Sequence, residues 1–91
     1  MKTSIRLHND DNIVIALKDF EKGSCLELNT GKIILQESIK FGHKIAIVPI
    51  SRHSKILKYG LSIGSATKDI CAGAHVHSHN LKTDYVASQQ K

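Results

Sequence analysis

The feature that most constrains the fold is the shortness of the apolar runs, each of which ends at a glycine or a polar turn cluster. The longest unbroken aliphatic run covers only residues 13–17, too few for a stable helix. The aliphatic residues favour strands, with twelve Ile and four Val against eight Leu. The pattern predicts an all-β fold of about seven short strands, a small barrel or clip rather than a sandwich of long strands.

The first half predicts two hairpins. The first is expected to pair residues 4–8 with residues 12–17 around the turn cluster at residues 10–12. The second is expected to pair residues 25–28 with residues 32–36 around Gly31. Between them, residues 18–23 are expected to hold one short helical turn closed by Gly23.

In the second half, Gly42, Gly60, Gly64 and Gly73 separate short apolar segments. Residues 63–70 fit either a strand or a helical turn. The other expected elements are strands over residues 44–50, 56–59 and 74–79, with a turn at 51–54.

The 91-residue length allows one domain, expected over residues 1–83, with a polar tail over residues 84–91. A membrane span needs about 20 apolar residues and a signal peptide needs an apolar segment near the start; neither pattern is found. We therefore expect a soluble, cytoplasmic chain. Cys25 and Cys71 lack metal-site spacing and are expected to be buried free thiols.

Charge is unevenly distributed along the chain. The formal net charge is +5, and residues 38–83 carry seven basic side chains against the single acid Asp69. Such a surface attracts anions, for example a carboxylate metabolite or an acidic protein. Nucleic acid is not expected as a partner, because four aromatic residues cannot provide a base-stacking platform. An open edge strand would offer a route to a homo-oligomer.

The densest chemistry is the run His75-Val76-His77-Ser78-His79-Asn80. On a strand, the three imidazoles would project from one face. His75 and His79 would then lie about 13 Å apart, too far to share one ion, so a mononuclear metal site needs a bend and another carboxylate or histidine. Imidazole and oxygen ligands suit Fe(II), Mn(II) or Zn(II). Histidine can also serve as a general acid or base, and a solvated strand with no ligand stays open as an alternative.

Two further short motifs could contact a ligand. Gly42-His43-Lys44 lets the backbone approach a ligand and places a cation beside it, although a simple strand-entry turn explains it equally well. Lys58-Tyr59-Gly60 offers an ammonium and a hydroxyl on opposite faces of a strand, so that one of the two points inward.

Taken in order, these motifs resemble the small N-terminal module of the altronate and galactarate dehydratase family. The resemblance covers about residues 5–83 and rests on segments 11–17, 42–46, 56–60, 63–66, 69–70 and 75–80 and on Gly73. It implies a SAF-type β-clip fold, in a module that either precedes a much larger catalytic domain or forms a separate small subunit. Relatives eliminate water from sugar acids or sulfite from sulfolactate, and Fe(II) or Mn(II) is associated with the dehydratases.

The resemblance implies a site with catalytic, metal-binding and substrate-binding residues. His77 and His79 are the expected catalytic residues, and His75, His77 and His79 the expected metal ligands. The expected substrate-binding residues are His43, Lys44, Lys58, Tyr59 and Asn80. The chain departs from the family at Arg52-His53 and at Ser62, both in expected turns.

The resemblance predicts a non-autonomous subunit of a sugar-acid dehydratase, inactive alone and completed by a large catalytic partner. A sulfolactate sulfo-lyase subunit is one alternative. A sugar-acid-binding or regulatory module without catalytic residues is another.

Overall fold

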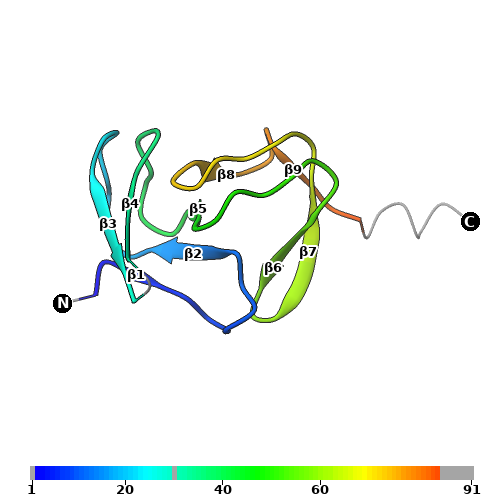
Figure 1. Ribbon diagram of the computed structural model, residues 1–91, viewed down its shortest axis with the longest axis horizontal. Helices are drawn as coiled ribbons and strands as arrows, with labels where there is room; N and C mark the ends of the chain where they lie inside the picture. Colours follow the sequence, from blue (N-terminus) through cyan, green and yellow to red (C-terminus); the bar gives the residue numbers. More distant parts are fainter. Residues whose placement is uncertain (1, 30, 85–91) are drawn as a thin grey trace, which may run out of the picture.

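The computed structural model describes residues 2–29 and 31–84, which form nine short strands in three antiparallel sheets (Figure 1). The central sheet has the order β1 (Ser4–Ile5), β2 (Ile13–Ala16), β5 (Lys44–Ala46) and β8 (His75–Val76). The described residues contain no helix, and so none that could cross a membrane. The expected all-β class is confirmed.

Two smaller sheets flank the central one. β3 (Cys25–Leu28) and β4 (Gly31–Ile34) form a hairpin; β6 (Lys55–Lys58), β7 (Leu61–Ala66) and β9 (Leu81–Lys82) form a three-stranded sheet. Both expected hairpins are therefore present, although β1 is shorter than predicted. Residues 63–66 belong to β7, which decides the open alternative for them in favour of a strand; residues 67–70 form neither a strand nor a helical turn, apart from the bridge of Ile70 to Ile50.

Three local expectations are wrong. The predicted helical turn before Gly23 is a reverse turn, in which Ser24 N–H donates to Glu21 O and Gly23 has a φ of 89°. The strand that begins at Lys44 ends at Ala46, and the chain returns to bridge pairing only at Ile50. Cys25 and Cys71 are free but exposed: Cys25 alternates with buried Leu26, and Cys71 begins a turn.

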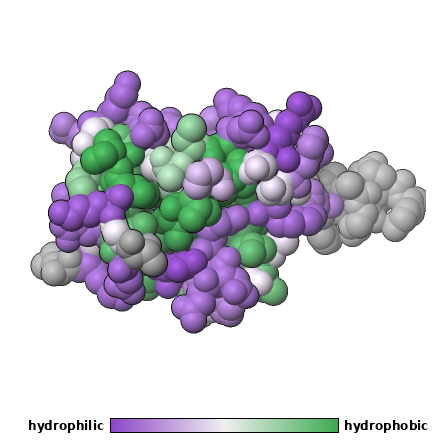
Figure 2. Space-filling model, viewed as in Figure 1, coloured by the Kyte–Doolittle hydropathy of each residue, from purple (hydrophilic) through white to green (hydrophobic). Residues whose placement is uncertain are grey.

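Two apolar cores lie on opposite faces of the central sheet, because side chains alternate along its strands. Ile13 and Ala46 point into one core, which the β6–β7 hairpin covers; Val14 and Ile45 point into the other, which the β3–β4 hairpin covers. Figure 2 shows apolar side chains over the central sheet and the β3–β4 hairpin, bordered by hydrophilic ones.

The turn between β1 and β2 ties the central sheet to β6. The buried Asp11 carboxylate accepts the backbone N–H groups of Tyr59 and Gly60 at 2.8 and 2.7 Å. Asn12 Oδ1 accepts Leu57 N–H at 2.9 Å, and Asn12 Nδ2 donates to Lys55 O at 3.0 Å. Because each polar side chain holds two backbone groups, this turn fixes where the two sheets meet.

The last described residue of the predicted tail is also held in place. Asp84 Oδ2 accepts hydrogen bonds from Lys55 Nζ and Ser65 Oγ, each at 2.8 Å. The remainder of the predicted tail, residues 85–91, lies outside the described residues.

Candidate functional site

Four of the histidines predicted as site residues gather at one end of the central sheet. His43 immediately precedes β5, and His75 begins β8, the strand that pairs with it. The ring centroids of His43 and His75 are 5.0 Å apart, and those of His43 and His77 are 5.3 Å apart. The His75 ring lies 5.4 Å from His77 and 5.6 Å from His79. We call these four residues the histidine cluster.

The cluster forms because the strand predicted over residues 74–79 is wrong: β8 ends at Val76, and the chain then turns back. Asn80 stabilises this turn. Its Oδ1 accepts His77 N–H and its Nδ2 donates to His75 O, both at 2.9 Å. The turn brings His79 back towards His75, instead of the separation of about 13 Å on a straight strand. Asn80 is only 3% exposed, so the described contacts give it a structural role, and its substrate-binding role stays a prediction.

Glu37 supplies the carboxylate that the sequence analysis expected from elsewhere in the chain. Its Oε2 accepts the backbone N–H of His75 at 3.0 Å. One donor atom from each of Glu37, His75 and His79 lies within 4.8 Å of the other two. Ligands of one cation, each about 2.1 Å from it, lie about 3–4 Å apart, so small side-chain movements would close this set.

The sequence did not identify Glu37, although one signal was available. It is the only acidic residue between Glu27 and Asp69, in an otherwise basic stretch. Its neighbour Gln36 donates its backbone N–H to Gly73 O at 2.9 Å, which fixes this loop beside the strand that carries His75. The three possible metal-binding side chains that lie close together are therefore Glu37, His75 and His79, whereas the predicted metal ligands were His75, His77 and His79.

His75 has the chemistry of a metal ligand. Burial, followed by the neighbouring His43, lowers its pKa, so the neutral imidazole that a metal requires is favoured. His43 Nδ1 and His75 Nε2 are 2.8 Å apart, a hydrogen-bond distance at which one ring carries the proton and the other accepts it. If His75 bound a cation through Nδ1, its Nε2 would carry that proton and donate it to His43.

His77 is exposed and accessible to a ligand in solution. Its ring stacks on those of His43 and His75, and its Nδ1 is 3.2 Å from Ser78 Oγ. An exposed imidazole can donate a proton to a bound molecule or accept one from it.

The two predicted lysines form a separate group. Lys44 pairs with Ile15 and Val76, whose side chains pack in the core beneath β6, whereas His75 leaves the sheet on the other face. Burial and then the charge of Lys58 lower the pKa of Lys44. Among the described residues neither ammonium has an acidic partner. A carboxylate bound between them would relieve this repulsion.

Tyr59 follows Lys58 in the chain and is exposed to solvent. Its side chain is 68% exposed, and its φ of 62° marks the tight turn that Asp11 holds. Lys58 is half-buried, and the expectation that one of the two residues points inward stays a prediction.

Comparison with known proteins agrees with this architecture. A family model described as the altronate/galactarate dehydratase SAF domain matches residues 2–84. An altronate dehydratase of Bacillus subtilis is 44% identical over 84 residues, which cover 92% of this chain and 17% of that protein. The (2R)-sulfolactate sulfo-lyase subunit alpha of Chromohalobacter salexigens is 30% identical over 91 residues, 91% of this chain and 97% of that protein.

A galactarate dehydratase of Escherichia coli is 32% identical over 72 residues, 79% of this chain and 14% of that protein. The chain therefore spans about a sixth of the length of the dehydratases it matches, and nearly the whole length of the sulfo-lyase subunit.

Proposed function

The chain belongs to the altronate/galactarate dehydratase SAF domain family, and on this premise we propose that it is one component of a sugar-acid hydro-lyase. It contributes substrate- and metal-binding residues, and a larger catalytic polypeptide completes the site. The observation that carries this proposal is the meeting of Glu37, His75 and His79 beside two further imidazoles at one end of the central sheet. A cytoplasmic location is part of the proposal.

A divalent cation, Fe(II) or Mn(II), is the proposed cofactor, held by Glu37, His75 and His79. Two imidazoles and a carboxylate suit such a cation and leave coordination positions open. When bound, it would stabilise negative charge that develops on the substrate during elimination. The lowered pKa of His75 supports this choice, since His75 then binds without first losing a proton.

The remaining residues have proposed roles that follow from their positions. Elimination of water needs a base for the proton next to the carboxylate and an acid for the departing hydroxyl. We assign proton transfer to His77, which is exposed, and place His79, the other predicted catalytic residue, among the metal ligands. Lys44 and Lys58, on the other face of the central sheet, form an adjacent pair of cations that would bind a carboxylate group apart from the histidine cluster.

The site needs a partner because it is open to solvent. His77 and His79 are exposed, and so small a domain has no deep pocket around them from which water is excluded. We therefore expect negligible turnover by the chain alone.

Sulfite elimination is the second candidate function. It is favoured by the sulfolactate sulfo-lyase relative, which matches over 97% of its own length and is itself a subunit rather than a whole enzyme.

The test is turnover by this chain purified together with the large polypeptide that it captures from its native lysate, with Fe(II) or Mn(II) added without oxygen. The substrates are altronate, galactarate and sulfolactate, and activity should appear only with both chains. H77A and H79A variants should abolish turnover and leave assembly intact. Full turnover by the chain alone would refute the need for a partner. Unchanged turnover in both histidine variants would favour the scaffold or regulatory module.

A further inference from the structure

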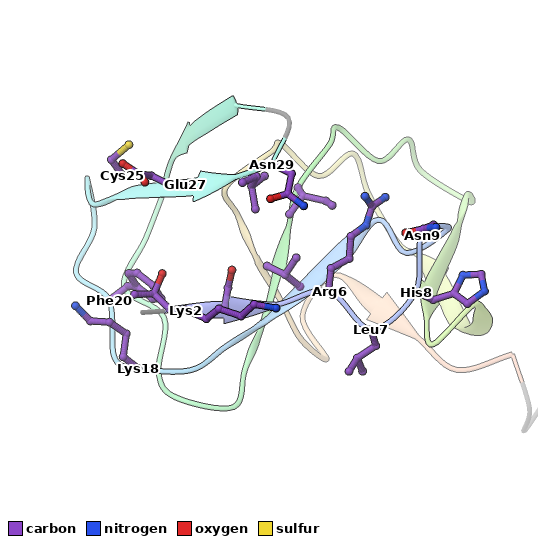
Figure 3. A pocket seen from close by; sticks show the side chains of 15 residues that line it. Lys2, Arg6, Leu7, His8, Asn9, Lys18, Phe20, Cys25, Glu27 and Asn29 are labelled. Carbon is purple, nitrogen blue, oxygen red and sulfur yellow. The ribbon is translucent and has the colours of Figure 1, made fainter.

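A groove of about 700 Å³ lies between the start of the chain and the β3–β4 hairpin (Figure 3). No member of the histidine cluster lines it, and neither do Glu37, Lys44 and Lys58. Its apolar lining includes Val14 and Phe20, which belong to the core beneath the hairpin. This volume is within the range of about 300–1,000 Å³ that is usual for binding pockets.

Both walls of the groove are open strand edges. β1 is the edge strand of the central sheet, and β3 has β4 as its only partner among the described residues. Leu17 N–H donates to Thr3 O. Because residues of an antiparallel strand point their backbone groups alternately towards the partner strand and away from it, the N–H and C=O of the next residue, Ser4, face away from β2. Leu35 N–H donates to Ser24 O, and by the same alternation the peptide groups of Cys25 and Glu27 face away from β4.

These outward peptide groups lie where a ligand would meet them. Ser4, Cys25 and Glu27 all line the groove, and within residues 2–29 and 31–84 their outward groups have no backbone partner. Open edges of this kind pair readily with an added strand.

The rim of the groove is basic. Lys2, Arg6 and Lys18 line it against the single acid Glu27. Arg6 Nε and Nη2 donate to Asp11 O at 3.0 and 2.8 Å, which holds this guanidinium in position. Lys18 Nζ lies 5.3 Å from the centroid of the Phe20 ring, and among the described residues it has no acidic partner.

We propose that this groove binds an extended acidic segment of a partner polypeptide, which adds as a strand to the edge of β1 or β3. In such a segment, alternate side chains would face the apolar lining, and the others would face the basic rim. The inference goes beyond the proposed function, because it uses none of the residues assigned to the lyase site and does not depend on metal. A second copy fits poorly, since antiparallel pairing of two β1 edges would place Lys2 and Arg6 of both copies together.

The test uses the full chain, labelled with ¹⁵N, and a heptapeptide of alternating glutamate and valine. Two control peptides replace glutamate by lysine, or valine by N-methylvaline, which cannot donate backbone hydrogen bonds. With the glutamate peptide we expect saturable NMR shifts at Ser4, Cys25 and Glu27, and slower hydrogen exchange on the edge that pairs, at Ser4 for β1 or at Cys25 and Glu27 for β3. Either control should have little effect. Binding should weaken as salt is raised.

A charge reversal at the rim gives a matched comparison. K18E should weaken binding of the glutamate peptide several-fold, whereas K22E, at a position that does not line the groove, should leave it nearly unchanged.

Four results of the binding measurements would overturn the proposal. They are no binding tighter than about 1 mM, equal binding of the lysine peptide, shifts confined to the histidine cluster, and equally strong binding of free glutamate. A concentration-dependent dimer that buries the same amides would make a second copy the occupant, and would also overturn it.

Discussion

Glu37 has two roles in the candidate site. Its carboxylate fixes the start of β8 through His75 N–H, and it is also one of three donors that can share a cation. A glutamine would keep an oxygen for the backbone hydrogen bond but would lose the charge. The substitution therefore separates the structural role from the metal-binding one.

We predict that E37Q weakens binding of Co(II), a coloured substitute for Fe(II), by at least about tenfold, because a neutral amide is a poor ligand for a divalent cation. Visible absorption of bound Co(II) during titration measures the effect. E27Q, on β3, is the matched control and should bind as the unmodified chain does. Equal affinity in E37Q would remove Glu37 from the ligand set.

Asn80 is the second residue whose side chain decides the geometry of the cluster. N80A removes the acceptor for His77 N–H and the donor to His75 O. We expect a loss of about 1–3 kcal/mol in the free energy of unfolding, measured by urea denaturation. S78A, in the same turn but exposed, should change it by less than about 0.5 kcal/mol. A similar loss in both variants would show that the turn does not depend on the Asn80 amide.

At the scale of elements, the β3–β4 hairpin packs against the turn before β8 through Gly73. A Cβ at Gly73 would lie 2.3 Å from Ile34 O, whereas a Cβ at Gly23 would have nothing within 4 Å. Both glycines have a φ of 89°. Alanine would therefore meet the same backbone strain at both positions, and only at Gly73 would its Cβ also clash with the hairpin.

From this comparison of Gly73 with Gly23, we predict that G73A destabilises the protein more than G23A does. Each alanine should cost about 1–2 kcal/mol for its left-handed backbone, and G73A a further 1–3 kcal/mol or so because the hairpin must move away. Thermal unfolding followed by circular dichroism measures both. Equal losses would mean that the hairpin shifts without cost.

The elements that the sequence predicts well are those held by local contacts. The β1–β2 and β3–β4 hairpins follow from alternating apolar residues around polar turns, and both are confirmed. The helical turn near Gly23 is wrong because Phe20 pairs with Ile39, far along the chain, in an isolated bridge. The strand predicted through His79 is wrong because the Asn80 side chain takes the backbone groups that a longer strand would use.

The candidate site follows the same division. The family motifs identify His43, His75, His77 and His79, which the structure brings together. Glu37 joins them through two long-range hydrogen bonds that no local pattern encodes, one from Gln36 N–H to Gly73 O and one from His75 N–H to the Glu37 carboxylate. The opposite faces of Lys44 and His75 also depend on strand pairing rather than on their distance in the sequence.

At the scale of the whole molecule, the two cores share one sheet. Neighbouring residues of β2 and β5 point alternately into one core and the other, as Ile13 and Val14 do. Neither core can lose its part of this sheet while the other stays intact. The molecule should therefore unfold in a single cooperative step, although it has two separate apolar clusters.

We test this with the same substitution in each core. Ile39 and Ile56 are fully buried in different cores, and I39V and I56V each remove one methylene group. Each should lower the free energy of unfolding by about 0.5–1.5 kcal/mol, and the double variant should lose the sum of the two, because the sites share no contact. Urea unfolding followed by circular dichroism, and by the NMR signals of both cores, measures this. Two separate transitions, with I39V shifting only one of them, would show instead that the hairpin core unfolds independently of the core beneath β6.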